Sequence, residues 1–398
     1  MANNGGNVYD VQKLRRDEFP LSEEYLYFNH ASISPLPART RARMAEAVQR
    51  LSQHPMKFFA ETLMPLTEQL MTDIASYINA TSAEEIVPVT STSSGLSAIA
   101  NAIEWRPGDN VLFCEIEFPS NAYPWLSLQR KGVEVRKVPA VEGGLTLDAL
   151  APLVDENTRL VAASAIQFFS GHRTNLAAVG AFCHARDILF VVDAIQAIGH
   201  MPIDVQAMHI DALSSGGQKS LLAAPGIGFL YVRGDLCSQL EPAPIGPNAT
   251  QDFMHWLDYD LTPRPGAARF AMGTWDVVGW YGLASSLELL QELGVANIDR
   301  HTSTLAAEAI AMLQRRGFEI VTPAGHGPIV TFQSGLSSEQ TDRIVALLDE
   351  ECVSVVKHLD ADGEPHIRLS FHAYNTSDEL RRFETLFEEV YERVCSES

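Results

Sequence analysis

The sequence predicts an α/β protein built on a mainly parallel seven-stranded sheet, with a smaller α+β domain beside it. The chain has 398 residues, enough for two domains with buried cores. Seven short apolar runs are separated by stretches long enough for helices, as in doubly wound sheets. After about residue 284 the pattern changes to two stretches of helical periodicity, followed by segments that alternate like strands.

The seven apolar runs are the predicted strands of the larger domain, and they lie at 86–89, 111–114, 133–138, 160–165, 189–193, 211–214 and 227–232. The Pro-rich segment EPAPIGPNATQ then interrupts the alternation and predicts a long loop toward a pocket mouth. Beyond it, SSLELLQELG and RHTSTLAAEAIAMLQRRG are the expected helices, and IVTFQS, SVVKHL and IRLSF the expected strands. We therefore predict a large domain over 25–283 and a small domain over 1–24 and 284–398.

Composition excludes several classes of partner. With 29 basic and 50 acidic residues, the formal charge of −21 disfavours nucleic acid and anionic membranes. No apolar run is long enough to cross a membrane. The five cysteines lack the close spacing of a zinc or dithiol motif, so no metal site is expected. The polar start MANNGGNVYD does not resemble a signal peptide, and a cytoplasmic location is expected.

A lysine and an aspartate follow two neighbouring predicted strands. Asp193 ends the run 189–193, and Lys219 lies in the small-residue segment SSGGQKS after the run 211–214. Open α/β sheets bind ligands at the carboxyl ends of their strands, so both side chains are expected at one site. A lysine there can hold pyridoxal phosphate (PLP) as a Schiff base, while a buried carboxylate favours a charged pyridine nitrogen. Either residue alone is explained as well by a turn cap or a solvated lysine, but the pair favours a catalytic PLP site.

A candidate phosphate site lies in VPVTSTSSGLSAIANAI. This segment has a short apolar strand, then a run of hydroxyl residues, then an Ala-rich stretch with helical spacing. Hydroxyls and free backbone amides at a helix amino terminus bind anions, so Thr92 and Ser93 are expected to bind the cofactor phosphate. Such a helix start is also common without any ligand. Gln196, close after Asp193, is expected to contact the ring oxygen or the face of the cofactor.

Seven segments together carry a family resemblance, and they are YFNHASISPLP, TSTSSG, EIEFPSNAYPW, VVDAIQAIG, SSGGQKSLLAAPGIGFLYV, RFAMGTWD and IRLSFHAYNTSDEL. Through them the chain, from about Tyr27 to its last helix, resembles the class V aminotransferase and cysteine desulfurase-like group of fold type I PLP-dependent enzymes. The resemblance implies a PLP cofactor and a small-molecule amino acid substrate.

The resemblance also implies roles for individual residues. Phe118 takes the position that stacks on the cofactor ring, where many members have histidine. Gly273 and Thr274 match a segment that reaches the partner subunit's phosphate, which implies a homodimer with a shared active site. Arg368 matches the arginine that binds the substrate carboxylate, a task suited to a two-pronged guanidinium. A surface arginine paired with a nearby acid is the alternative for Arg368.

The sequence departs from the family at several positions near the cofactor. Gln218 replaces the histidine that many relatives have just before the lysine, and it is expected to contact the cofactor. The asparagine often found near the ring oxygen is replaced within SAIQFFSGHR, leaving Gln167 as the expected polar partner and Phe168 and Phe169 as pocket walls. Since both usual histidines are replaced, Lys219 is the only base expected close to the substrate's α carbon.

A further departure concerns cysteine. Desulfurases and selenocysteine lyases carry a cysteine in a loop shortly before the carboxylate-binding arginine, and this chain reads SVVKHLDADGEPHIR there. Cys352 lies upstream in an apparent helix-to-strand stretch and is interpreted as a packing residue. A sulfur-transfer enzyme that forms a persulfide on its own cysteine is therefore not expected.

These features predict an enzyme, with a class V-like aminotransferase as the main functional prediction. In it, Lys219 acts as Schiff-base partner and proton carrier, and Arg368 holds the substrate carboxylate. The alternative is a PLP-dependent carbon–sulfur (β-elimination) lyase or an epimerase acting on a substituted amino acid. A non-catalytic PLP-binding scaffold is a third possibility, against which the joint presence of Lys219, Asp193 and Arg368 argues. The sequence leaves open the amino acid substrate and the use of a keto acid.

Three further residues are candidate substrate contacts. His30, in YFNHASISP, lies in the amino-terminal loop that family members place near the substrate. A turn-stabilising role explains His30 equally well. Tyr123 and Lys357 are weaker candidates for the same role.

Overall fold

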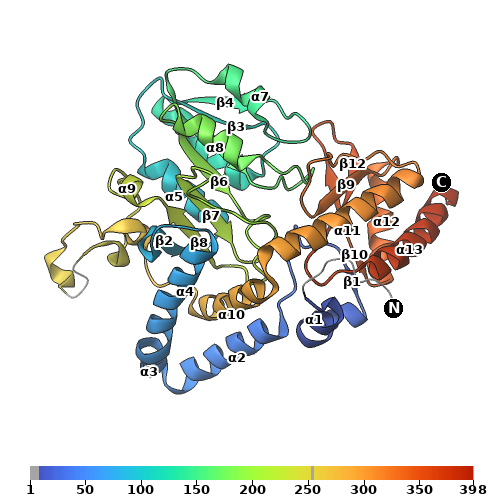
Figure 1. The fold of residues 1–398 in the computed structure, drawn as a ribbon, viewed down its shortest axis with the longest axis horizontal. Coiled ribbons are helices and arrows are strands. Elements are labelled where there is room, and N and C mark those ends of the chain that lie inside the picture. Colours follow the sequence, from blue (N-terminus) through green and yellow to red (C-terminus); the bar gives the residue numbers. More distant parts are fainter. Residues whose placement is uncertain (1–8, 252–254, 398) are drawn as a thin grey trace.

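The computed structural model describes residues 9–251 and 255–397, and its centre is a seven-stranded sheet (Figure 1). The strand order is β2-β8-β7-β6-β5-β3-β4. The strands are β2 (Ile86–Val89), β3 (Asn110–Cys114), β4 (Glu134–Val138), β5 (Thr158–Ser164), β6 (Leu189–Asp193), β7 (Ala212–Gly216) and β8 (Gly228–Val232). Each predicted apolar run forms one of these strands, so the predicted mainly parallel sheet is confirmed.

The strand next to one edge of this sheet runs against both of its neighbours. β8 pairs antiparallel with both β7 and β2, whereas the pairs from β7 to β4 are parallel. The connection 217–227 between β7 and β8 is too short for a crossover helix, so the chain turns back beside the strand it has just left. This short connection carries Lys219.

Helices of the large domain pack on the sheet or on one another. They are α2 (Ala38–Gln53), α3 (Pro55–Phe58), α4 (Met64–Tyr77), α5 (Thr92–Ala102), α6 (Tyr123–Leu126), α7 (Leu147–Leu150), α8 (Leu176–His184), α9 (Gly234–Cys237) and α10 (Val277–Leu293). α5 packs against β7 and β8, and α10 packs against α2 and α4. The helix that begins at the expected phosphate site therefore lies directly on the strand that leads to Lys219.

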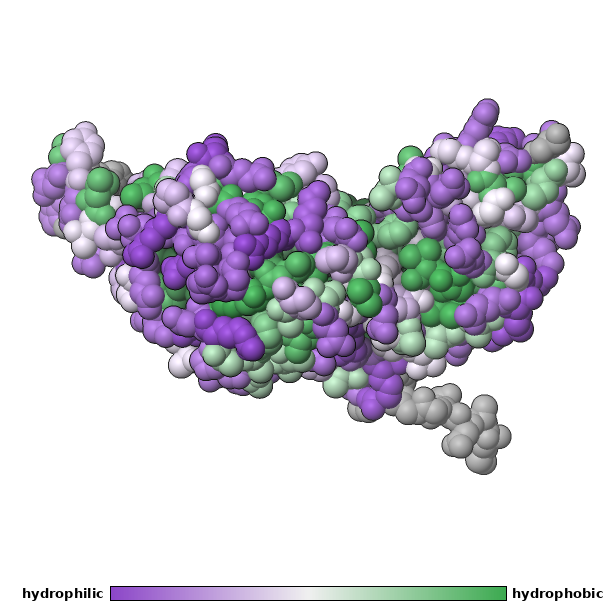
Figure 2. All heavy atoms as spheres, turned by 90° about the horizontal axis from the view of Figure 1, so that it is seen from above, coloured by the Kyte–Doolittle hydropathy of each residue, from purple (hydrophilic) through white to green (hydrophobic). Residues whose placement is uncertain are grey.

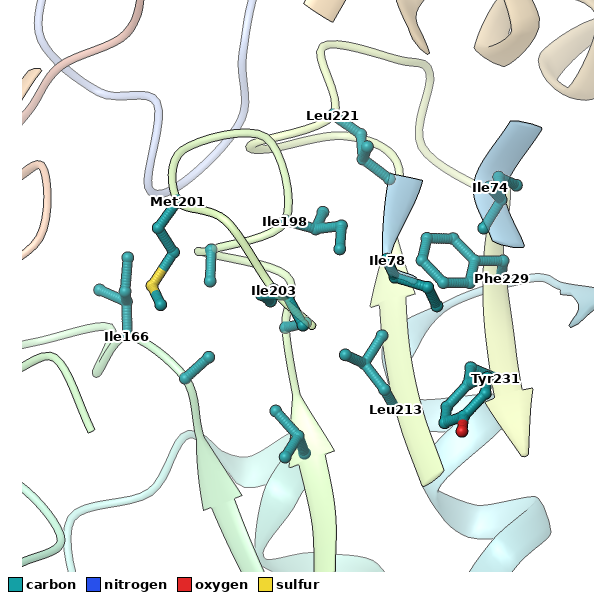
Figure 3. Packing of buried hydrophobic residues seen from close by; sticks show 14 of the residues in the cluster. Ile74, Ile78, Ile166, Ile198, Met201, Ile203, Leu213, Leu221, Phe229 and Tyr231 are labelled. Carbon is teal, nitrogen blue, oxygen red and sulfur yellow. The ribbon is translucent and has the colours of Figure 1, made fainter. Parts of the chain in front are cut away.

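Apolar packing fixes the loops that carry the expected catalytic residues (Figure 3). Ile198 follows the Asp193 loop and Leu221 follows Lys219, and both side chains are buried in one cluster with Leu213 and Phe229 of the sheet. Full burial of each such side chain contributes about 1.5–3 kcal/mol. These buried contacts anchor both loops to the sheet beneath them.

The smaller domain, at the right of Figure 1, is a three-stranded antiparallel sheet of order β11-β12-β9 covered by helices. Its elements are α11 (Val295–Arg315), β9 (Ile329–Gln333), α12 (Ser338–Glu350), β10 (Val353–Ser354), β11 (Val356–Leu359), β12 (Pro365–Ser370) and α13 (Ser377–Ser396). Within α11, Ile298 packs in the hydrophobic core of the large domain, whereas Leu305 packs in the core of the small domain. The predicted boundaries at 24/25 and 283/284 remain predictions.

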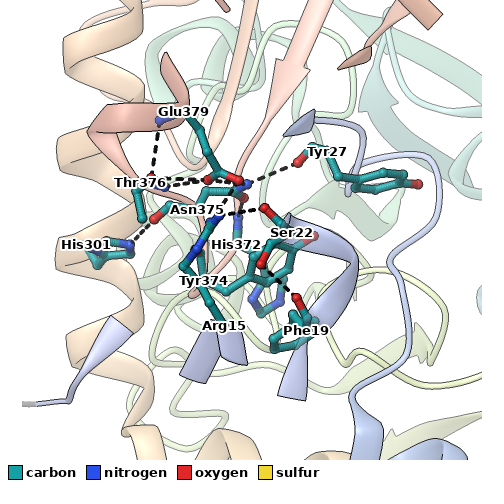
Figure 4. A network of polar contacts seen from close by, with 10 residues as sticks. All are labelled: Arg15, Phe19, Ser22, Tyr27, His301, His372, Tyr374, Asn375, Thr376 and Glu379. Atoms are coloured by element: carbon teal, nitrogen blue, oxygen red, sulfur yellow. Dashed lines mark hydrogen bonds and ion pairs between the residues drawn. The ribbon is translucent and has the colours of Figure 1, made fainter. Parts of the chain in front are cut away.

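The amino-terminal segment is fastened to the small domain by polar contacts (Figure 4). It comprises α1 (Val11–Glu18) and β1 (Leu26–Tyr27), and β1 pairs in parallel with β10. Arg15 forms an ion pair of 2.8 Å with the buried Glu379, and the Asn375 amide donates to the Tyr27 carbonyl at 3.1 Å. These contacts fix the start of the loop that follows β1. No helix among the described residues has both the length and the apolar character to cross a bilayer.

Candidate active site

A cavity of about 350 Å³ lies where the carboxyl ends of the central strands meet the small domain. Its lining residues are Ala31, Ser32, Ser91, Thr92, Ser93, Phe118, Ser120, Ser164, Ile166, Phe168, Asp193, Ile195, Gln196, Gln218, Lys219, His358 and Arg368. In the view of Figure 2 the molecular surface is hollowed between the two lobes. The volume is within the range of small-molecule sites.

Lys219 projects into this cavity with an amine that no described residue binds by a hydrogen bond. The residue is 9% exposed, and its Nζ lies 5.2 Å from the centre of the Phe118 ring. Burial lowers the pKa of Lys219 to about 8, the charge of Asp193 opposes this effect, and that of Arg368 adds to it. About one tenth of the amine is therefore free of its proton at pH 7, far more than for an ordinary lysine, which suits a nucleophile and base.

Asp193 ends β6 on the floor of the cavity. Its Oδ1 accepts a hydrogen bond of 3.0 Å from the Ile195 amide, and no described residue forms a salt bridge with it. Burial raises the pKa of Asp193 to about 6, against the opposing effects of the Ile195 amide and of Lys219. The carboxylate is thus charged at neutral pH in a dry site, and a cationic ligand atom would stabilise it. Gln196 lines the same wall and donates to the Ala31 carbonyl at 2.9 Å.

The raised pKa of Asp193 leads to a stability prediction for the cofactor-free protein. The folded state binds the proton of the Asp193 carboxyl more tightly than the unfolded state does. Ionisation of this carboxyl therefore lowers the free energy of unfolding, starting as the pH rises above about 4 and reaching its full extent above about 6. Asp193→Asn keeps the oxygen that accepts from Ile195 and removes the charge. We expect the variant to be more stable than the wild type at pH 8 by about 2–3 kcal/mol.

Urea unfolding of the two cofactor-free proteins at pH 8 and pH 4.5 measures this difference. The stability gain should shrink toward zero at pH 4.5, where the wild-type carboxyl is protonated. If Asp193→Asn and the wild type were equally stable at pH 8 as well as at pH 4.5, the Asp193 carboxylate would not be desolvated in the folded protein.

The opposite end of the cavity is the amino terminus of α5. Ser91 caps this helix through a reciprocal pair of hydrogen bonds with Ser94. The Thr92 hydroxyl accepts from the Gly216 amide at 2.8 Å, and the Ser93 and Ser120 hydroxyls lie 2.7 Å apart at the cavity wall. Both predicted phosphate contacts therefore line the cavity, beside unpaired amides at the positive end of a helix.

Gln218 also lines the cavity, folded back over a glycine. A Cβ at Gly216 would lie 2.6 Å from the Gln218 Oε1 and 3.4 Å from the Thr92 hydroxyl. Any larger residue at position 216 would therefore displace the Gln218 side chain. The Gln218 side chain therefore lies close to Thr92, at the end of the cavity where the cofactor phosphate is expected.

Arg368 lies on the small-domain side of the cavity, on β12, and is 2% exposed. Its Nη1 donates to the Phe168 carbonyl at 2.7 Å, its Nη2 donates to the Ser32 hydroxyl at 2.8 Å, and its Nε is buried without a partner. No acidic side chain among the described residues forms a salt bridge with it, which excludes the alternative of a surface ion pair. Burial lowers the pKa of Arg368 to about 9, so the guanidinium stays charged at neutral pH. A buried cation held only by neutral groups is suited to an anionic ligand.

Gln167 does not line the cavity. Its Nε2 donates to the Ile116 carbonyl and its Oε1 accepts from the Phe169 amide at 2.8 Å. Side chains alternate along this extended stretch, so Ser164, Ile166 and Phe168 face the cavity instead.

Ser164 supplies the polar group at this wall. Its amide donates to the buried Glu117 carboxyl at 2.8 Å and its hydroxyl donates to the other carboxyl oxygen. Burial raises the pKa of Glu117 to about 7, with a smaller contribution from the negative charge of Asp193. Near neutral pH the Glu117 carboxyl beside Ser164 is therefore close to half protonated.

The three candidate substrate contacts lie outside this cavity. His30 is buried behind it, where its Nδ1 lies 2.9 Å from the Ser34 hydroxyl and its ring packs on His372. Tyr123 is 66% exposed at the start of α6. Lys357 points to the other face of β11, where it bonds to Ser338 of α12. Ala31 and Ser32, just after His30, take the place expected for the histidine.

Gly273 and Thr274 do not line this chain's own cavity. Thr274 is exposed, and a Cβ at Gly273 would meet no atom within 4 Å. This placement is compatible with their implied role at a second subunit. That role, and the homodimer itself, remain predictions.

Apart from Ser91, which belongs to the hydroxyl run of the expected phosphate site, four polar lining residues were not recognised in the sequence, and they are Ser32, Ser120, Ser164 and His358. Three of them lie within two residues of a position that the sequence singled out. Only His358 had a usable local signal, because it follows Lys357 in an alternating strand and therefore faces the opposite side. The serines are defined by partners distant in the chain, which no local pattern reveals.

The cavity fits PLP at each of its chemical groups. The α5 terminus and its hydroxyls suit the phosphate, Asp193 suits the pyridine nitrogen, and the unbound Lys219 amine suits the aldehyde. Phe118 provides an aromatic wall beside that amine. Thr92 and Lys219 are brought to one cavity by separate strands, so the fit does not depend on one flexible segment.

Comparison with known proteins agrees with this reading of the cavity. Residues 26–383 match the family model described as Aminotransferase class-V. A protein named "Probable cysteine desulfurase" from Methanothermobacter thermautotrophicus is 31% identical over 96% of this chain and 98% of its own length.

Two solved structures share the fold. The apo structure of a cysteine desulfurase from Thermococcus onnurineus has a TM-score of 0.87 at 24% identity, covering 98% of this chain and all of the other. The complex of the cystine C-S lyase C-DES with its reaction product cysteine persulfide has a TM-score of 0.83 at 22% identity, covering 94% of this chain and 99% of the other. The predicted family and cofactor are thereby confirmed: the chain belongs to the class-V aminotransferase family and is a PLP-dependent enzyme of fold type I.

Proposed function

We propose that this enzyme is a carbon–sulfur lyase, which removes a sulfur substituent from the β carbon of an amino acid by elimination. The observation that carries the proposal is the composition of the cavity. It holds an unbound lysine, a buried carboxylate and an unpaired guanidinium, and no cysteine is among its lining residues. Such a site can bind an amino acid and remove its α proton, but it has no thiol to receive sulfur.

The first proposed step is binding of the substrate carboxylate by Arg368. The guanidinium is already oriented by the Phe168 carbonyl and the Ser32 hydroxyl, so little side-chain entropy is lost on binding. Its buried Nε has no partner in the protein and is free to donate. This contact fixes the substrate at the small-domain side of the cavity.

Proton transfer is then assigned to Lys219. PLP, when bound, withdraws electrons from the substrate's α carbon, and Asp193 maintains the positive charge on the ring that this requires. The Lys219 amine, with a pKa near 8, removes the α proton and holds it on Nζ. Phe118 has no ionisable group, so it shields this amine from solvent without competing for the proton.

Elimination completes the sequence. The bond between the β carbon and sulfur breaks with both electrons going to sulfur, and the three-carbon product is hydrolysed by water to pyruvate and ammonia. A thiol or a persulfide is the second product, depending on what the sulfur carried. No oxidant, reductant or keto acid is consumed.

The positions of the cysteines disfavour sulfur transfer onto the protein. Cys114, Cys183 and Cys237 are buried in the core. Burial raises the pKa of Cys114 and of Cys183 to about 12, which suppresses the reactive thiolate. Cys352 and Cys395 are exposed and do not line the cavity.

The comparisons support the lyase alternative more than the aminotransferase that the sequence favoured. The relative from Methanothermobacter is named for removing sulfur from cysteine, and one of the neighbours in fold is titled a cystine C-S lyase. Transamination uses the same lysine, aspartate and arginine, and it remains the second candidate because the family is named for it. The homodimer, with Gly273 and Thr274 at the partner's site, stays part of the proposal.

Product analysis tests the proposal. The PLP-loaded enzyme would be incubated with L-cystine, L-cysteine and S-methyl-L-cysteine without any keto acid. We expect pyruvate and ammonia in equal amounts, together with a free thiol or persulfide. Alanine as the main product would instead indicate desulfuration of cysteine, and the keto acid of the intact substrate would indicate transamination.

A further inference from the structure

One histidine in the cavity has no task in the chemistry described above. His358 lies on β11 and lines the cavity together with Lys219 and Arg368. None of the described residues forms a hydrogen bond with its ring, and its Nε2 is buried without any partner. A buried polar atom normally has a hydrogen-bond partner, so an unpaired ring nitrogen beside a ligand cavity indicates that the bound ligand supplies that partner.

The strand register places His358 and Arg368 on one face of the small sheet. Val356 pairs with Arg368, and His358 pairs with His366, in the antiparallel ladder of β11 and β12. His358 is therefore a diagonal neighbour of Arg368, at the roughly 7–8 Å spacing typical of such pairs. A substrate whose carboxylate is bound by Arg368 therefore extends its other groups within reach of His358.

Aromatic packing holds the imidazole in place. The ring makes edge contacts with Phe168 and Phe169, at centroid distances of 5.8 and 6.2 Å. Its pKa is lowered to about 4 by burial and by the nearby charges of Arg368 and Lys219. At neutral pH the ring is therefore uncharged and carries one N–H donor in a fixed orientation.

The remaining polar groups of the cavity have other positions. Ser32 is bonded to Arg368, Ser164 donates to Glu117, and Gln196 donates to the Ala31 carbonyl. The hydroxyls of Ser91, Ser93 and Ser120 and the side chain of Gln218 lie near the phosphate end, at the start of α5. Ile166 and Phe168, which complete the wall near His358, have no side-chain donor. Among the lining side chains, His358 is thus the donor best placed for the part of the substrate that is neither carboxylate nor α carbon.

We propose that His358 recognises the β substituent of the substrate and donates a hydrogen bond to the sulfur as it leaves. This role rests on the lyase function proposed above. As the carbon–sulfur bond breaks, sulfur gains the electron pair and becomes a thiolate. The imidazole N–H stabilises that charge and keeps its own proton, and the thiolate is protonated by water after it leaves the site. The α proton stays on Lys219 through this step and is released before the next turnover to the solvent, where it neutralises the hydroxide left by protonation of the thiolate.

The test compares leaving groups that do and do not need such a donor. L-Cystine and S-methyl-L-cysteine release sulfur, whereas β-chloro-L-alanine releases chloride, which is stable as an anion without help. His358→Leu should lower kcat with the sulfur substrates about 10- to 100-fold, the range for a hydrogen bond to a charged group. Turnover of β-chloro-L-alanine should change less than about threefold. His358→Gln, which keeps an N–H donor, should recover part of the loss.

Two measurements separate this role from a structural one. The dissociation constant of L-alanine, which has no β substituent, is measured from the change in cofactor absorbance and should be the same in His358→Leu and wild type. His366→Gln is the matched control, since His366 pairs with His358 and contacts Phe169 but does not line the cavity. This control should turn over both substrate classes at the wild-type rate.

The possible failures are distinguishable. Equal losses with sulfur and chloride substrates, or no loss with either, would overturn the role of His358 while leaving the lyase function intact. Wild-type enzyme that releases pyruvate from neither L-cystine nor S-methyl-L-cysteine would overturn the lyase function and, with it, the role of His358.

Discussion

Replacing Lys219 with alanine is expected to abolish turnover and the visible absorbance of the lysine-bound cofactor, while leaving the fold intact. The lysine is assigned both the covalent bond to PLP and the transfer of the α proton. Loss of a positioned base alone costs about 10²- to 10⁴-fold in rate. Since no other lining residue takes over both roles, we expect the upper end of this range. The measurement is pyruvate release from a sulfur-containing amino acid, together with the absorbance spectrum of the purified protein.

Lys357→Ala is the matched control. Lys357 lies on the outer face of β11, where it bonds to Ser338 and pairs with Asp342 of α12. Removing it should leave the spectrum and the rate unchanged. A Lys219→Ala protein with the wild-type spectrum would show that another residue holds the cofactor.

Replacing Arg368 with leucine is expected to produce the second-largest effect, on substrate use rather than on cofactor binding. The substrate carboxylate would then enter a dry site with no cation to meet it. Truncating one partner of a buried charge pair costs about 2–5 kcal/mol, which corresponds to a fall of about 30- to several thousandfold in kcat/KM. The visible spectrum should be retained because Arg368 lies across the cavity from the phosphate end.

Ser32→Ala is informative beside this variant. The serine accepts one hydrogen bond from Arg368 at 2.8 Å, so its loss frees the guanidinium without removing the charge. We expect a fall in kcat/KM of less than about tenfold. If Arg368→Leu and wild type used the substrate equally well, the carboxylate would have to bind elsewhere in the cavity.

Local sequence patterns were sufficient to predict the architecture and the centre of the site. The seven strands were recognisable because buried strands are short apolar runs, and two of these runs, β6 and β7, lead directly to Asp193 and Lys219. Asp193 and Lys219 were found in this way, since the carboxyl end of a strand fixes which edge of the sheet its next residue reaches. Arg368 was found through the family resemblance, and its lack of an acidic partner appears only in the folded protein.

The misplaced residues share one physical reason. Gln167 was expected in the cavity and Ser164 faces it instead, just as Lys357 was considered and His358 faces it. In both stretches the side chains alternate between two faces, and the composition of the stretch does not reveal which face meets the cavity. A shift of one residue therefore exchanges a structural side chain for a functional one.

The expectation that Lys219 would be the only base near the substrate also changes. That expectation followed from the two histidines missing from their usual positions, Phe118 and Gln218. The cavity does contain a histidine, supplied by the small domain from the strand in which the sequence had singled out the neighbouring Lys357 instead. Only the pairing of β11 with β12 brings His358 beside Arg368.

The most direct test of the lyase function is the number of pyruvate molecules formed per subunit in the absence of any keto acid. A lyase regenerates its starting form in every cycle, so we predict continuous release over many turnovers, with ammonia in equal amount and no persulfide on the protein. A transaminase acting on the same sulfur-containing amino acid would release no pyruvate. It would form one molecule of the intact substrate's keto acid per subunit and would resume only when a keto acid is added. That single turnover would contradict the function proposed for this cavity.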